Sequence, residues 1–218
     1  MSLSGSKTFS VDSLALSDLP GNTSILLTGD DSAALEAVFY RIVAAPDDEQ
    51  SIVLATDADG RSTQRALKKA VRGAEDRASV LACEGPDRGE DVTTVEDLSD
   101  LTRLGMDFSG AFAEAQQDSA PVRAGILLCS TIMGEVDDTR SVYRFLNSNF
   151  LSQLRRGKAL GVCAIDTSAD IGTDVNSTIA GLETSFGARI DVESTGRKQA
   201  TLDISGLSNH DGTIDVSW

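Results

Sequence analysis

The sequence is poor in residues on which many hydrolases and metal sites depend, with one histidine and three cysteines among 218 residues. His210 lies in SNHDGT, a segment typical of a turn, so we expect an exposed loop histidine and no Ser-His-Asp or Cys-His nucleophile. Cys83, Cys129 and Cys163 are far apart and form no CxxC motif. We therefore expect buried free thiols, with no disulfide, zinc site or other metal centre.

Long hydrophobic runs are also missing. No apolar segment reaches the roughly 20 residues that span a bilayer, and the first ten residues, MSLSGSKTFS, have no hydrophobic signal core. Hydrophobic residues still make up 40% of the chain, which is enough for one domain with a sizeable core. These features predict a cytoplasmic globular protein without a membrane span.

Lysine is scarce, with 5 Lys against 14 Arg, while Asp and Glu total 34 and the net charge is −15. An acidic, lysine-poor surface is typical of extreme halophiles, whose cytoplasm is rich in salt. Such a surface repels nucleic acid as a whole, so a nucleic-acid partner is not expected. At about 1 M salt the Debye length falls to about 3 Å, which screens this repulsion. The charge therefore indicates habitat better than it indicates a partner.

Five unbroken apolar runs are separated by segments in which apolar residues recur at helical spacing. The runs predict strands at residues 24–28, 51–56, 78–83, 124–130 and 159–166. Apolar strands that alternate with helices form a mostly parallel sheet covered on both faces. The middle of the chain thus predicts an α/β fold of three layers in one domain.

The two ends of the chain differ from this middle part. Residues 1–22 are rich in Ser, Asp and Gly, and we expect this leader either to lie over the surface or to be loose, which places the domain at residues 23–218. Near the C-terminus, ARIDVES, QATLDIS and TIDVSW alternate apolar and polar residues. They predict a small antiparallel extension at the edge of the sheet.

The segment LLTGDDSAALEAV has the order strand, glycine turn, helix that a phosphate-binding loop has, but it lacks the residues of such a loop. Counted from Gly29 in the pattern G-x-x-x-x-G-K-[ST], the positions of the second glycine, the lysine and the hydroxyl hold Ala34, Leu35 and Glu36. The lysine would neutralise the phosphates and the hydroxyl would hold Mg²⁺. Both functions are missing here.

The residues that follow the glycine also oppose phosphate binding. Asp30 and Asp31 place negative charge where the phosphates would arrive, and like charges repel even beside the positive end of a helix. Asp31 or Ser32 is the natural N-cap, so the helix begins by Ser32 and leaves little room for a cradle. We interpret Gly29, Asp30, Asp31 and Ser32 as a degenerate phosphate loop.

The acidic residue that would bind the magnesium ion of such a site is absent as well. A Walker-B strand ends in an acidic residue that holds magnesium, whereas GILLCST offers Cys129 and Ser130 at that position. A neutral thiol is a poor ligand for a hard cation. The sequence therefore predicts a degenerate Walker-B position at Cys129 and Ser130, and neither a nucleotide nor a metal as cofactor.

Three segments resemble haloarchaeal relatives of the RecA/KaiC ATPase superfamily: DLSDLTRLGMDFSGAFAEA (97–115), VYRFLNSNFLSQLRRGKALGVCAID (142–166) and the ending TIDVSW. In those proteins a DLT-x-IGI helix precedes the Walker-B strand, and a RFLH-type helix leads into an LGV strand. The resemblance covers residues 22–218 and implies a three-layer RecA-like P-loop NTPase fold. It implies that the strand at the glycine turn is central and that the LGVCAID strand lies between it and GILLCS.

The resemblance also raises a question about the segment LATDADG. Active members carry a carboxylate at the end of the second strand that positions the attacking water, so Asp57 or Asp59 is a candidate relic of that role. The pattern Asp-x-Asp-Gly after a strand is also a common turn and helix cap. We favour the cap, because a base without phosphate and metal sites has nothing to act on.

Two groups of basic residues are candidates for contacts with a partner. The first follows that turn and consists of Arg61, Arg65, Lys68, Lys69 and Arg72. It either docks an acidic partner or another subunit, or is a solvated helix face stabilised by the helix dipole.

The second group, Arg155, Arg156 and Lys158, lies at the end of the RFLNSNF helix. The resemblance offers trans-acting arginines of an oligomer as one role for them. Capping charges at a helix C-terminus are the simpler interpretation, which we favour.

These features predict a RecA/KaiC-like protein that is not an enzyme and has no catalytic residue. We expect a regulatory or scaffold protein that acts through protein–protein contacts, as a homo-oligomer or with an active paralogue. One alternative is a nucleotide-binding signalling ATPase with a divergent phosphate loop. A second is a nucleic-acid-associated recombinase-like module, which the net charge and the lack of an aromatic-basic stretch disfavour.

Overall fold

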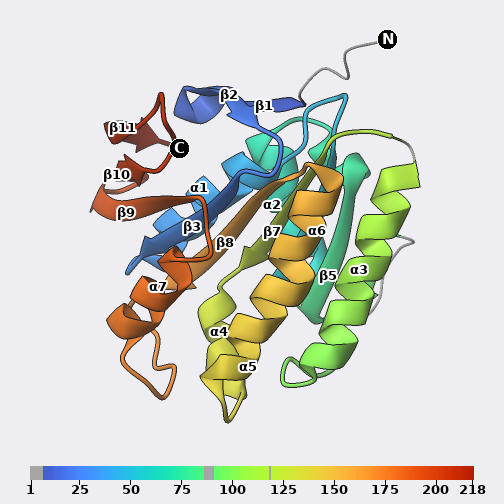
Figure 1. Ribbon diagram of the computed structural model, residues 1–218. Coiled ribbons are helices and arrows are strands. Elements are labelled where there is room, and N and C mark those ends of the chain that lie inside the picture. The colour runs from blue at the N-terminus through green and yellow to red at the C-terminus, as the bar shows by residue number, and fades with distance from the viewer. Residues whose placement is uncertain (1–6, 86–90, 118) are drawn as a thin grey trace.

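A nine-stranded sheet forms the middle layer of the computed structural model, which describes residues 7–85, 91–117 and 119–218 (Figure 1). Its strand order is β11-β10-β9-β3-β8-β7-β4-β5-β6. The five predicted strands are present and pair in parallel: β3 (Ser24–Gly29), β4 (Gln50–Asp59), β5 (Ala78–Glu84), β7 (Val122–Leu127) and β8 (Leu160–Asp166). The prediction of a mostly parallel α/β sheet is confirmed.

Helices cover both faces of this sheet and complete the three layers (Figure 1). One face carries α1 (Ser32–Val43) and α2 (Gly60–Ala70). The other carries α3 (Leu101–Gln117), α4 (Cys129–Glu135), α5 (Thr139–Phe145), the π-helical turn η3 (Leu146–Phe150), α6 (Leu151–Gly157) and α7 (Val175–Glu183). Among the helices of the described residues, none has the length and apolar character needed to cross a membrane.

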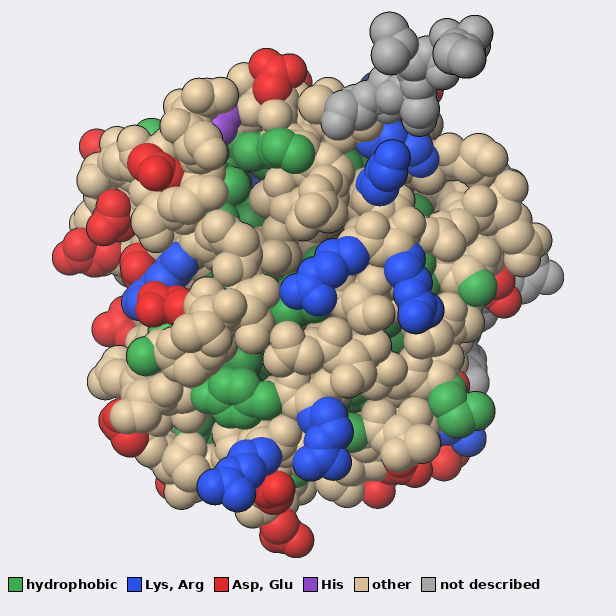
Figure 2. All heavy atoms as spheres, in the orientation of Figure 1, with side chains coloured by type: hydrophobic (Ala, Val, Ile, Leu, Met, Phe, Trp, Pro, Cys, Tyr) green, Lys and Arg blue, Asp and Glu red, His purple; other side chains and the backbone are tan. Residues whose placement is uncertain are grey.

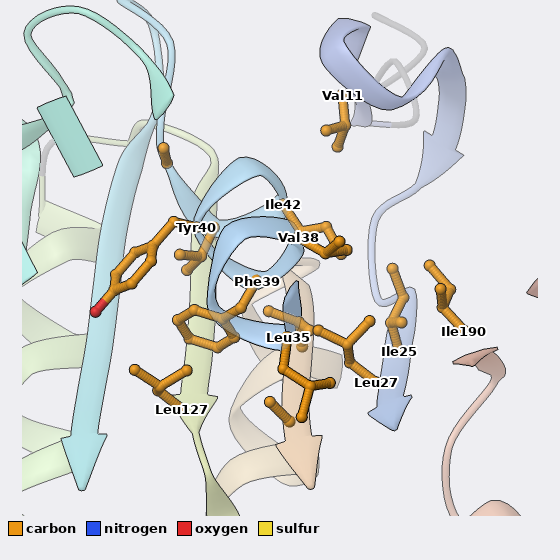
Figure 3. Packing of buried hydrophobic residues seen from close by; sticks show 14 of the residues in the cluster. Val11, Ile25, Leu27, Leu35, Val38, Phe39, Tyr40, Ile42, Leu127 and Ile190 are labelled. Carbon is orange, nitrogen blue, oxygen red and sulfur yellow. The ribbon is translucent and has the colours of Figure 1, made fainter. Parts of the chain in front are cut away.

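Each face of the sheet has its own hydrophobic core. Successive residues of β3 alternate between the two, since Ile25 and Leu27 belong to the core under α1 and Leu26 to the core on the other face. Figure 3 shows Leu35 and Phe39 of α1 directed at the sheet, where Leu27 lies. Burial on both sides explains why these strands appear in the sequence as unbroken apolar runs.

The order of the central strands agrees with the resemblance. β8 lies between β3 and β7, with Cys163 paired to Leu26 on one side and to Ile126 on the other. The carboxyl ends of these strands meet at one edge of the sheet, and this places the glycine turn and the end of β7 close together.

The C-terminal strands form the predicted antiparallel extension. β10 (Gln199–Ser205) pairs antiparallel with both β9 (Ala188–Gly196) and β11 (Gly212–Ser217). β9 also pairs with β3, and this pairing is parallel. The extension is therefore continuous with the main sheet and has β11 at its outer edge.

Short elements that the sequence analysis did not predict complete the structure. Besides the helix α4, they are β1 (Thr8–Val11), β2 (Leu16–Pro20), β6 (Val92–Thr94) and the 3₁₀ turns η1 (Asp12–Leu14) and η2 (Ala74–Arg77). The first two strands form an antiparallel pair from the leader. The described part of the leader packs on the domain and buries Phe9, Val11, Leu14, Leu16 and Leu19.

A buried arginine fastens this leader to the sheet. Arg123 in β7 is 2% exposed, and its guanidinium donates to the backbone carbonyls of Ile42 at 2.9 Å and Ser10 at 2.8 Å. It also forms an ion pair with Glu49 and lies 5.8 Å from the ring centroid of Phe9. His210 adds a second link, with Nε2 2.8 Å from the carbonyl oxygen of Ser17.

Candidate functional site

The connection between β3 and α1 is the segment for which the sequence predicted a degenerate phosphate loop. It consists of Asp30 and Asp31 alone, because β3 ends at Gly29 and α1 begins at Ser32. A phosphate loop needs four residues between its two glycines to curl its backbone amides around a phosphate. Two residues are too few to form that cradle.

Asp31 occupies the N-terminus of α1 with its own carboxylate. The side chain accepts a hydrogen bond from the amide of Ala34 at 3.1 Å, so Asp31, one of the two residues predicted for this position, is the N-cap. A hydrogen bond from the side chain of Ser194, together with those from the amides of Ala34 and Ala33, lowers the pKa of Asp31 below its usual value. The N-terminus of α1, which attracts anions, is therefore already occupied by the carboxylate of Asp31.

The packing of the strands explains why position 29 is a glycine, without any ligand. It is the last residue of β3 and pairs with Asp166 of β8 and Val192 of β9. A Cβ atom at this position would lie 2.7 Å from the carbonyl oxygen of Val192. The close approach of the β9 backbone requires glycine here.

Asp166, at the end of β8, joins the glycine turn to the predicted Walker-B position. Ser32 Oγ donates to its carboxylate at 2.8 Å, and its backbone amide donates to Ser130 Oγ at 3.2 Å. The carboxylate also accepts from the amide and the hydroxyl of Ser168, at 2.8 and 2.6 Å. The structure thus brings the glycine turn and the Walker-B position to one edge of the sheet, with both serine hydroxyls engaged by protein groups.

The predicted strand end at Cys129 and Ser130 is wrong. β7 ends at Leu127, Leu128 takes a left-handed backbone conformation with φ 52°, and Cys129 begins α4. The hydroxyl of Thr56 donates to the carbonyls of Leu127 at 2.7 Å and Leu128 at 3.0 Å, so these carbonyls bind a side chain where the chain turns. Apolar character alone could not distinguish a buried helix start from a strand end.

The side chain at the Walker-B position faces the core. Cys129 is fully buried, and Ser130 is 3% exposed. A hydrogen bond with Cys129, followed by burial, raises the pKa of the Cys163 thiol. Cys129 and Cys163 are buried, as expected, whereas Cys83 is only partly buried. The buried thiol of Cys129 forms a hydrogen bond with the thiol of Cys163 and is therefore not placed to bind magnesium at the edge of the sheet.

A charged network beside the turn was not found from the sequence. The hydroxyl of Thr28 donates to Asp191 of β9, and Arg189 pairs with both Asp191, at 2.6 Å, and Glu183. Arg189 is therefore already held by two carboxylates. The signal was the spacing Arg-x-Asp in ARIDVES, which puts both side chains on one face of a strand.

The two aspartates after β4 have different surroundings. Asp59 caps α2, and accepts from the amide and the hydroxyl of Ser62 at 2.9 and 2.8 Å, which is the cap that we favoured. Asp57 is exposed; burial, followed by the negative charge of Asp57, raises the pKa of Glu36 on α1. In the described parts of the chain, no group of three or more His, Cys, Asp or Glu side chains could hold a metal ion.

The basic residues at α2 are exposed and partly engaged. Lys68 forms an ion pair with Glu75 at 2.6 Å. Arg65 donates to Ser62 Oγ at 3.0 Å and to the carbonyl of Arg61 at 3.3 Å. These contacts fit a solvated helix face, while the exposure of all five side chains keeps a docking surface open.

A cavity of about 390 Å³ lies beside this helix and was not predicted. It opens between α1 and α2, and Tyr40, Lys69 and Trp218 contribute to its lining. Trp218 packs against the core under α1 and α2.

A second basic face lies on the opposite side of the sheet, over α5 and α6. Figure 2 shows Lys and Arg side chains over the middle of this face, with most Asp and Glu around its rim. Its arginines, Arg140, Arg144, Arg155 and Arg156, are all exposed. Lys158 takes the left-handed C-cap position of α6, in agreement with the capping interpretation.

The residues at the glycine turn do not fit a nucleotide triphosphate. The connection has no lysine, its two carboxylates are negative, and the N-terminus of α1 is capped by Asp31. The hydroxyls of Ser32 and Ser130 already bond to Asp166. No step of ATP hydrolysis can be assigned to these side chains.

Comparisons with known proteins agree with the fold. The chain is similar to the crystal structure of a KaiC-like protein from the hyperthermophilic archaeon Pyrococcus horikoshii, with a TM-score of 0.58 and 12% identity over 94% of this chain and 88% of the other. This likeness establishes a KaiC-like RecA fold. None of the curated proteins matches the chain. The profile of one family matches residues 22–192, and the chain therefore belongs to that family, a family of unknown function (DUF7504).

Proposed function

We propose that this protein is a catalytically inactive RecA/KaiC-like protein, a pseudo-ATPase that serves as a regulator or scaffold through protein–protein contacts. One observation carries the proposal. The β3–α1 connection is two aspartates long, and the carboxylate of Asp31 sits on the helix N-terminus that would otherwise receive a phosphate. Binding of ATP would require a longer loop, a cation and the removal of that cap.

Thermal unfolding with and without Mg-ATP tests this proposal. A ligand at about 100 times its Kd stabilises the native state by about 2.7 kcal/mol, which raises the Tm of a chain of this size by roughly 5–10 °C. Mg-ATP at about 5 mM would therefore reveal a Kd as weak as about 50 µM. We expect a Tm change below about 1 °C relative to MgCl₂ and KCl of equal ionic strength. A clear rise would instead support the nucleotide-binding signalling ATPase.

The partner in this proposal is a protein, either another copy of the chain or an active paralogue. RecA-like domains assemble through the edges of their cores, which is an argument from the fold alone. Light scattering of the purified chain at several concentrations tests self-association. Binding of single-stranded DNA across a salt series tests the recombinase-like alternative, for which affinity would fall steeply as salt rises.

The net charge supports the proposal that the protein works in a salt-rich cytoplasm, such as that of haloarchaea. A net charge of −15 on a chain of 218 residues creates self-repulsion that salt screens. A protein adapted to that setting gains stability as the KCl concentration rises, and this can be measured.

A further inference from the structure

A groove runs between α3 and the helix that continues from α5 through η3 into α6. Its volume is about 670 Å³, and it is open to solvent on the face shown in Figure 2. Its floor is closed where the two helices touch, since a Cβ atom at Gly105 would lie 2.5 Å from Nδ2 of Asn149. Its lining includes Leu101, Gly105, Met106, Arg144, Phe145 and Asn149.

The apolar wall of this groove is unusual for this protein. Met106 on α3 is 66% exposed, and among the described residues it is the one large hydrophobic side chain that is exposed. Leu104 and Phe108, its neighbours on the same helix, are buried. Methionine adapts to irregular partners and is enriched at protein interfaces. The side chain is therefore placed to meet an apolar surface of a partner.

The opposite wall includes Arg144, and the helical segment that forms this wall carries further positive charge. Residues 139–165 contain four arginines and one lysine, and no Asp or Glu, in a chain whose net charge is −15. Arg140 and Arg144 are four residues apart and so lie on the same side of α5. Arg155 and Arg156 extend the positive charge along α6. Within the described parts of the chain, none of these four guanidinium groups forms an ion pair, in contrast to Lys68, Arg77, Arg103, Arg123 and Arg189.

The shape of the groove suits a helix. The wall from Thr139 to Gly157 is about 28 Å long at 1.5 Å per residue, so a helix of about 18 residues would lie along it. The π-helical turn η3 lies in the middle of this wall, and such turns occur frequently at functional sites. A helix in this position would touch Met106 on one side and Arg144 on the other.

We propose that this groove docks an acidic amphipathic helix of a partner protein. The helix places its apolar residues against Met106 and Leu101 and its carboxylates against Arg140, Arg144, Arg155 and Arg156. A protein partner fits better than nucleic acid for two reasons. The rest of the surface repels a long polyanion, and Phe145, the aromatic side chain of the groove, is 3% exposed and cannot stack on a base. The inference rests on the proposed function only in that the partner is a protein.

A defined peptide library tests this assignment. The full chain is used to select from displayed helical peptides of about 18 residues with randomised surface positions, and the selected peptides are measured by fluorescence anisotropy. We expect selected peptides to carry Asp or Glu at helical spacing beside an apolar stripe. Arg144→Glu should weaken binding by about tenfold and Arg140→Glu/Arg144→Glu by about a hundredfold, because like charges then face each other. Met106→Ala should weaken it by about fivefold through lost apolar contact.

A matched control variant distinguishes binding in the groove from a general effect of surface charge. Arg197→Glu makes the same charge change on an exposed turn at the far edge of the sheet and should leave binding within about twofold. The proposal is overturned if no acidic helix is selected, or if the peptides respond to Arg197→Glu as strongly as to Arg144→Glu. It is also overturned if Arg144→Glu abolishes self-association or binding of single-stranded DNA, since the occupant is then a second copy or a nucleic acid. These outcomes do not depend on whether the protein binds Mg-ATP. The docking proposal and the pseudo-ATPase proposal can therefore fail independently.

Discussion

Replacing Arg123 by methionine removes the group that joins the N-terminal leader to the sheet. The guanidinium is 2% exposed, and in the variant the carboxylate of Glu49 loses its ion pair while the carbonyls of Ile42 and Ser10 lose their donors. Removing one partner of a buried ion pair costs about 3–5 kcal/mol, because the other charge is left buried without compensation. Since domains are stable by only about 5–15 kcal/mol, Arg123→Met should lower the urea midpoint substantially.

The assay is urea unfolding followed by circular dichroism, with the free energy of unfolding extrapolated to water. Arg103→Met is the matched control, since Arg103 forms an exposed pair with Asp107 one helical turn away and should cost no more than about 0.5 kcal/mol. A double-mutant cycle with Glu49→Gln should give a coupling energy above about 1 kcal/mol. If Arg123→Met costs less than about 1 kcal/mol, the leader is not anchored as described.

Three further results are expected. Asp31→Ala should destabilise the domain by about 1 kcal/mol, because α1 loses its N-cap, and Asp31→Asn should restore most of it; equal losses would refute the cap. Hydrogen bonds from Ser62 and Ser177 lower the pKa values of Asp59 and Asp174 below 3.8, so their stabilisation is present above that pH and lost as the pH falls through the lowered values. Asp59→Asn should therefore flatten the acid limb of the stability profile, and an unchanged limb would contradict this. The urea midpoint should rise with KCl up to about 1 M or beyond, and a fall would remove the argument for a salt-rich habitat.

The strands of the sheet could be predicted from the sequence because each is buried on both faces. An apolar run such as SILLT has no alternation to mislead its assignment, and Asp31 marks the following helix by a local cap. The order β3-β8-β7 came from the resemblance, since pairing between distant strands leaves no local signal. The position of the leader could not be predicted from the sequence, because Arg123, which donates a hydrogen bond to Ser10, is more than 100 residues away in the chain.

The sequence indicated a strand end at Gly29 and a helix cap at Asp31 or Ser32 from local signals. The role of Asp166, which joins Ser32 to Ser130, could not be predicted because it depends on contacts between three elements. The start of α4 at Cys129 was missed because a buried strand and a buried helix start are equally apolar. The groove beside Met106 was also missed, because an exposed apolar residue is recognised only when the rest of the helix face is seen to be buried.

Isothermal titration calorimetry with Mg-ATP at high salt is the most direct test of the central claim, namely that the edge of the sheet between Gly29 and Ser130 does not accept a nucleotide. We expect no binding heat beyond the heat of dilution. The protein concentration should be high enough to detect a Kd of about 100 µM, which corresponds to a binding free energy of about −5.5 kcal/mol. A saturable isotherm with micromolar affinity that is lost in Gly29→Val would contradict it, provided that the variant keeps its fold.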